Sequence, residues 1–189
     1  MAITKVTGAM LGNYTGGSAD DTVVVGDGAG VAITTGVDNT ILGDSAGAAL
    51  TEGSSNTLIG HLAGDAITTV SFITAVGEKA LSANTSGQKN TAIGRAALQS
   101  ITSQDNNTAV GYNTLSGGSN TGGNNTAIGS DALSGNTTGD NNVALGYNAL
   151  ALNTTASSNV AIGRGALDAT TTGGFNVAVG DMSLSANTT

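Results

Sequence analysis

The chain has 189 residues, among them 30 Gly, no Pro, no Cys and only 3% aromatic residues. A compact enzyme of this length builds its core on large side chains, so the composition argues against a globular enzyme, and we expect no catalytic activity. With 13 acidic residues against five basic ones and a net charge of -8, the chain lacks the basic surface that binds nucleic acid. The absence of cysteine excludes disulfides and cysteine-bound metals.

Residues 1–21 stand outside the pattern that governs the rest of the chain. They contain no long apolar run, so we expect neither a signal peptide nor insertion into a membrane. The segment passes from ITKVTGAMLG into the glycine-rich GNYTGGSADD. Its expected role is to cap the first unit of the following domain or to attach the chain to another protein.

Residues 22–189 consist of ten copies of one repeat, each marked by a glycine. The spacing is 17 residues throughout except for one interval of 18, and the marker glycines are Gly26, Gly43, Gly60, Gly77, Gly94, Gly111, Gly129, Gly146, Gly163 and Gly180. The residue before each glycine is Val, Ile or Leu, and the third before it is Thr or Val. This period-two pattern of β-branched residues predicts one short strand per copy. Because 17 residues cannot fold alone, the copies are predicted to stack as an all-β parallel β-solenoid of ten coils, a rod about 50 Å long.

Two further positions of the repeat have a predictable role. Asn lies four residues before the marker glycine in eight of ten copies, and stacked Asn side chains are expected to form a hydrogen-bonded ladder along the axis. The residue after the glycine varies among Asp, His, Glu, Arg, Tyr and Ser, so it is predicted to face solvent.

A volume exchange links two other positions. In the first three coils the residue two before the marker glycine is large (Val24, Ile41, Leu58) and the residue four after it is Gly; in the other seven coils these are Ala and Leu. Close-packed interiors keep their volume, so the two positions should share one packed space. The residue two before the glycine lies on the opposite strand face from the aliphatic residue next to the glycine. Both faces therefore appear buried, although a thin solenoid buries only one. We predict that the alanine face meets other copies of the chain, most simply in a homotrimer; alternatively, Ala is merely tolerated at the surface.

No catalytic, cofactor-binding or metal-binding residue is predicted, and no cofactor is expected. His61 falls at the solvent-facing position. Asp27 and Asp44 occupy equivalent positions in adjacent coils, but no aromatic platform or further oxygen ligands accompany them, so solvated charge is the favoured interpretation over a glycosidase or cation site. The GDGAG stretch lacks the helix and the Lys of a phosphate loop.

Two arginines and two tyrosines share the exposed position after the marker glycine. They are Arg95, Arg164, Tyr112 and Tyr147. On one stripe of the rod they could present themselves to a sugar or to a partner, or serve as scattered solubility residues. The receptor-binding residues stay unknown at this stage.

The repeat as a whole resembles a known type. NTAIGRAAL and NTAIGSDAL, followed by NTTGDN, resemble the repeats of bacteriophage tail-fibre and other appendage proteins, and are similar to the NSVAIG-type repeats in the β-roll heads of trimeric autotransporter adhesins. The resemblance implies an elongated homotrimeric rod of a virion, a tail or head fibre that supports host attachment. It also implies contact with other virion proteins through residues 1–21 and a host-surface glycan as a further candidate partner.

Three alternatives stay open beside the virion fibre. One is an adhesin head or stalk segment at a bacterial surface, although this repeat unit is longer than that of the adhesin heads. A second is a self-stacking extracellular filament, since the final coil shows no evident cap. A third is an ice-binding solenoid, suggested by the recurring pairs Thr137–Thr138 and Thr154–Thr155.

Overall fold

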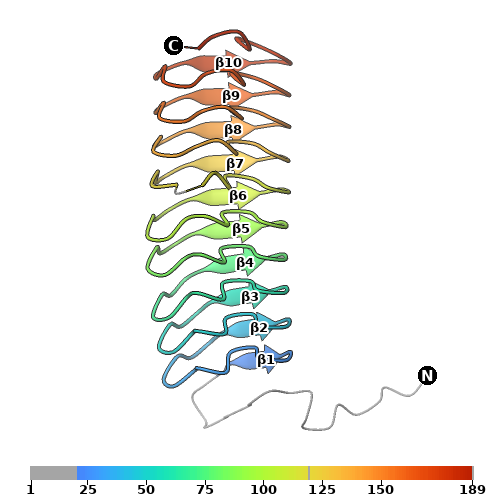
Figure 1. The fold of residues 1–189 in the computed structure, drawn as a ribbon, viewed down its shortest axis with the longest axis vertical. Coiled ribbons are helices and arrows are strands. Elements are labelled where there is room, and N and C mark those ends of the chain that lie inside the picture. The colour runs from blue at the N-terminus through green and yellow to red at the C-terminus, as the bar shows by residue number, and fades with distance from the viewer. Residues whose placement is uncertain (1–20, 119, 189) are drawn as a thin grey trace, which may run out of the picture.

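Ten stacked coils make up the molecule, as Figure 1 shows for the computed structural model, which describes residues 21–118 and 120–188. The predicted all-β parallel β-solenoid is confirmed. The predicted cap or attachment segment lies outside the described residues, apart from Asp21. The strands are β1 (Val23–Val25), β2 (Thr40–Leu42), β3 (Thr57–Ile59), β4 (Thr74–Val76), β5 (Thr91–Ile93), β6 (Thr108–Val110), β7 (Thr126–Ile128), β8 (Val143–Leu145), β9 (Val160–Ile162) and β10 (Val177–Val179).

The strands form one parallel sheet in chain order, β1 to β10, along the whole rod. Its register aligns equivalent residues of the repeat, so each strand lies directly over the previous one. The one 18-residue interval leaves this alignment intact, since Ala109 still pairs with Ala127. Leu115 and Asn125 also keep their usual partners in the neighbouring coils, so the extra residue is accommodated between them, outside the strand.

The middle residue of each strand points into the coil. This row is buried throughout, from Ile41 at 0% exposure to Ala144 at 0%. The predicted volume exchange is confirmed, because a Cβ added at Gly47 would lie 2.7 Å from Cδ1 of Leu58 and one added at Gly64 would lie 2.8 Å from its Cδ2. Where the strand residue is Ala, a Leu from the opposite wall takes the same space, and it is buried in coils 4 to 9.

The predicted assignment of the two strand faces is wrong. The alanine face is not available to another chain, because it lines the core of its own coil. The aliphatic row beside the marker glycines points outward instead, with Leu145 42% and Val179 66% exposed. The physical cause is the thin core of each coil. Only Ala fits opposite an inward-pointing Leu, so the larger aliphatic row lies outside.

Each coil turns by means of left-handed backbone positions. The marker glycines have φ between 128° and 140°, and a Cβ there would collide with the backbone of the next coil in nine of the ten. The leucine four residues later is also left-handed, with φ between 49° and 54°. That conformation costs about 1–2 kcal/mol for a non-glycine residue. Full burial of the side chain returns about 1.5–3 kcal/mol, so packing outweighs strain.

The asparagines four residues before the marker glycine form the expected ladder, but they bond to backbone rather than to each other. Asn125 is typical: its Oδ1 accepts from the backbone N–H of Asn142 at 2.9 Å, and its Nδ2 donates to the carbonyl of Gly139 at 2.9 Å. Seven of the eight asparagines bond two backbone groups of the following coil in this way, and these bonds satisfy their buried amides. In the last coil the Nδ2 of Asn176 has no partner among the described residues.

A second ladder was not expected from the sequence. One Thr per coil lies at the far corner from the marker glycine, and seven of these donate Oγ1 to the carbonyl of the corresponding Thr in the next coil; the donors are Thr34, Thr51, Thr85, Thr121, Thr137, Thr154 and Thr171. The threonine pairs that suggested ice binding therefore have one hydroxyl each engaged within the rod.

Candidate functional site

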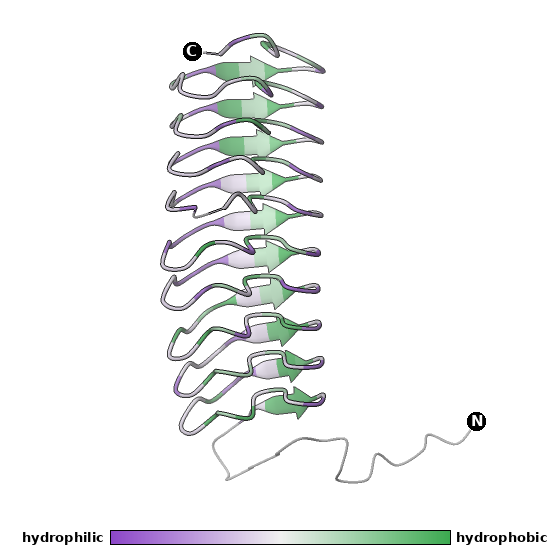
Figure 2. Ribbon diagram, in the orientation of Figure 1, coloured by the Kyte–Doolittle hydropathy of each residue, from purple (hydrophilic) through white to green (hydrophobic). Residues whose placement is uncertain are grey.

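The outward side of the ten strands forms one surface, which we call the outer sheet face. It consists of the first and third residue of every strand. The first is Thr in six consecutive strands, β2 to β7, and Val in the others; the third is always Val, Ile or Leu. No charged side chain belongs to it. In Figure 2 the third residues appear as a green stripe at the arrowheads, continuous from β1 to β10.

The outer sheet face has about the area of the largest patch that a typical monomer exposes, and six of its side chains are Thr. Three residues of strand span about 10 Å and ten coils about 48 Å, so the face covers about 480 Å² before side-chain relief is counted. Monomeric proteins rarely expose larger apolar patches, and those they expose usually bind something. Among its large side chains Leu42, Leu145 and Val177 are exposed by 46%, 42% and 68%.

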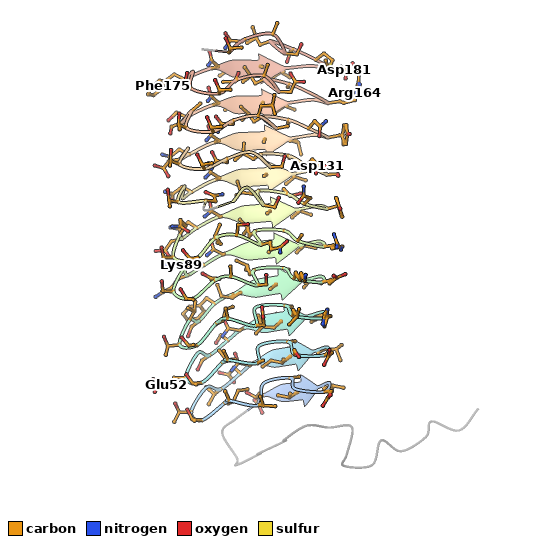
Figure 3. The ribbon with its side chains drawn as sticks, viewed as in Figure 1. Glu52, Lys89, Asp131, Arg164, Phe175 and Asp181 are labelled. Carbon is orange, nitrogen blue, oxygen red and sulfur yellow. The ribbon has the colours of Figure 1, made fainter. Side chains whose placement is uncertain are left out.

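The residues directly after the marker glycines form a second surface, the turn ridge. As predicted, they project into solvent at the edge of the sheet, where Figure 3 shows Arg164 beside Asp181. Neighbouring coils pair charges along it. Arg95 lies 3.3 Å from Glu78, and Arg164 binds both carboxylate oxygens of Asp181 at 2.8 and 2.9 Å. This contact holds the pKa of the Asp181 carboxyl below its usual range.

The candidate acid–base residues of the sequence do not converge. His61 Nε2 lies 3.5 Å from an oxygen of Asp44, and both side chains are at least half exposed. Asp27 makes no ion pair within residues 21–118 and 120–188. Ser45 Oγ donates to Asp44 Oδ1 at 3.5 Å. Within the described residues this hydroxyl makes no hydrogen bond to His61, so the exposed His61–Asp44 pair is a surface contact of the ridge.

Two buried carboxylate oxygens have no hydrogen-bond partner among the described residues. They belong to Asp65 and Asp168, which share one position of the repeat, five residues after the marker glycine. Partial burial raises the pKa of the Asp65 carboxyl. Across the described part of the chain no group of three His, Asp or Glu side chains is placed to hold a metal ion. The same residues include no helix with the length and apolarity to cross a membrane.

No protein-family model, curated protein or solved structure matches this chain. The resemblance of the NTAIG repeats to phage appendage proteins therefore stays a prediction, and function has to be argued from the surfaces themselves.

Proposed function

We propose that the chain is the rod of a structural appendage, a phage tail or head fibre that supports host attachment without catalysis, and that three copies associate through their outer sheet faces. The observation that carries this proposal is the uncharged face along all ten coils, with an aliphatic third residue in every strand. Solvent exposure of such a face is unfavourable, and burial against copies of itself requires no partner of other composition.

The shape of the face suits an assembly around one axis. Three faces of about 480 Å² together bury on the order of 1,400 Å², or about 480 Å² for each of the three pairwise contacts, which places each contact at the small end of protein interfaces. The sheet runs along the rod with its strands across the long axis and in register (Figure 1), so identical residues of three chains can meet around one axis. The charged turn ridge borders the face and would keep the assembly hydrated at its edges.

Light scattering after size-exclusion chromatography tests the assembly. We expect one species near 54.3 kDa, three times 18.1 kDa. A mass of 18.1 kDa would refute lateral association. A mass near twice 18.1 kDa would agree with association through the outer sheet face but would refute the trimer.

Two matched double variants locate the interface. Ile128→Lys with Leu145→Lys places two charges on the outer sheet face and should produce folded monomers. Thr138→Lys with Thr155→Lys places the same charges on the same two coils, at exposed positions away from the sheet, and should leave the trimer intact. Loss of the trimer in the second pair, or its persistence in the first, would contradict the proposed interface.

A further inference from the structure

The turn ridge has an internal order that charge pairing alone does not explain. From coil 4 to coil 10 its residues form a near palindrome about Ser130: acid, arginine, tyrosine, serine, tyrosine, arginine, acid. The seven residues are Glu78, Arg95, Tyr112, Ser130, Tyr147, Arg164 and Asp181.

In one half of this palindrome the arginine packs against the ring of the tyrosine. The guanidinium of Arg95 lies over the ring of Tyr112, 5.6 Å from the centroid, and Nη1 is 3.4 Å from the phenol oxygen. Glu78 fixes the arginine from the other side. The ring face of Tyr112 toward Arg95 is thereby covered, although the side chain is 52% exposed overall. The next coil along the rod carries Ser130 at the equivalent position.

The second half repeats the order of the residues in reverse. Tyr147 is 53% exposed, and Arg164, in the coil after it, is held by both oxygens of Asp181. Both tyrosines thus have an arginine on the side away from Ser130.

The spacing between the tyrosines suits a ring-shaped ligand. Equivalent residues of successive coils are about 4.8 Å apart, so a ring at the level of Ser130 would lie about 4.8 Å from the level of each tyrosine. Ring centroids that stack are about 4.5–7 Å apart. Serine is the smallest residue on this stretch of the ridge, and it leaves that level open.

Hydrogen-bonding groups surround the same level. Ser130 Oγ donates to Asp131 Oδ2 at 2.8 Å, and Asp131 Oδ1 accepts from the amide of Asn113 at 2.7 Å. The carboxylate and the serine oxygen keep lone pairs that can accept from ligand hydroxyls. Both arginines are already neutralised by acids and the chain carries a net charge of -8, so an anionic ligand is disfavoured.

We propose that Tyr112, Ser130 and Tyr147 form a binding site for a neutral hexose ring of a glycan. A sugar ring offers C–H faces that stack on aromatic rings and hydroxyls that bond at its rim, which is the combination present here. This inference names a ligand for the attachment role proposed above, but the site is built within one chain.

Glycan binding by the full chain tests the site. The probes are maltohexaose and cellohexaose, with oligogalacturonate as the anionic comparison, measured by isothermal titration. We expect a neutral hexaose to bind more tightly than the galacturonate. Tyr112→Ala with Tyr147→Ala should weaken that binding at least about tenfold, whereas Tyr→Phe at both positions should retain most of it because stacking survives. Phe72→Ala with Phe175→Ala is the matched control: both side chains are exposed aromatics away from the ridge, Phe175 on the opposite edge of the rod in Figure 3, and binding should not change.

Each other outcome overturns the site. Absence of binding by both neutral hexaoses, stronger binding of the galacturonate, or full binding by the double alanine variant would do so. Scattering mass separates this inference from the proposed assembly. A trimer that binds no neutral hexaose refutes the site alone, and a monomer that binds one refutes the assembly alone. If the double alanine variant loses the trimer, the ridge belongs to the subunit contact and the glycan site is refuted.

Discussion

The core packs in two ways: coils 1 to 3 have a large strand residue opposite Gly, and coils 4 to 10 have Ala opposite Leu. One double substitution should move the boundary between these two arrangements by one coil. Coil 3 has Leu58 with Gly64, and coil 4 has Ala75 with Leu81. Ala75→Leu together with Leu81→Gly converts coil 4 to the mode of coil 3. The new leucine would then lie between Gly64 and a glycine at position 81, as Leu58 now lies between Gly47 and Gly64.

The expected free energies follow from burial and backbone strain. Leu81→Gly alone removes a fully buried side chain, a loss of about 2–5 kcal/mol. Relief of its left-handed conformation, at φ 54°, returns about 1–2 kcal/mol. Ala75→Leu alone overpacks the coil, at a cost of about 1–3 kcal/mol. The double variant conserves volume and should lie within about 1 kcal/mol of the wild type, a coupling of about 3 kcal/mol.

Guanidinium unfolding followed by circular dichroism measures this coupling on the four proteins. The same exchange in coil 9, Ala161→Leu with Leu167→Gly, is the control, because there the new leucine would face Leu150 of the preceding coil rather than a glycine. It should cost at least about 2 kcal/mol more than the exchange in coil 4. Equal losses of unfolding free energy in the two double variants would refute the shared space. Additive effects of the two single substitutions in coil 4 would refute it as well.

Three further substitutions probe the ladders, the turns and the buried carboxyl. Gly94→Ala would drive a Cβ into the backbone of the next coil and should prevent folding or cost more than about 3 kcal/mol, whereas Gly118→Ala, with open space around it, should leave the denaturation midpoint unchanged. Asn125→Ala leaves a buried N–H and a buried carbonyl without partners and should cost about 2–4 kcal/mol; Asn124→Gly, at the exposed neighbour with φ 57°, should be near neutral, and equal losses would contradict the ladder. Asp65→Asn should raise Tm at pH 7. Because the folded-state pKa of Asp65 lies above its unfolded value, the native carboxyl destabilises the fold above the folded-state pKa, and this penalty disappears below the unfolded-state pKa. The gain in Tm should therefore vanish near pH 3, and a gain independent of pH would refute the titration of this group.

Much of the rod can be predicted from the sequence because ten copies of the repeat can be compared with one another. Ten aligned copies reveal the strand by its period-two pattern, the solvent-facing position by its variability and the shared core space by the exchange seen at Leu58 and Gly64. A single copy carries none of these signals. The Thr of the second ladder is common to all copies, but in coil 6 it lies ten rather than eight residues after the marker glycine, which hides its alignment there.

What only the tertiary structure decided is which strand face lies inside and which ridge residues meet. Alternation shows that a strand has two faces, but not which of two apolar rows faces inward. That choice depends on the opposite wall, where a left-handed backbone turns Leu81 and its equivalents into the coil and leaves room for Ala alone. The contact of Arg95 with Tyr112 likewise depends on side-chain directions between coils. Sequence spacing determines the coil in which a residue lies, whereas the closing of the coil determines the direction in which it points.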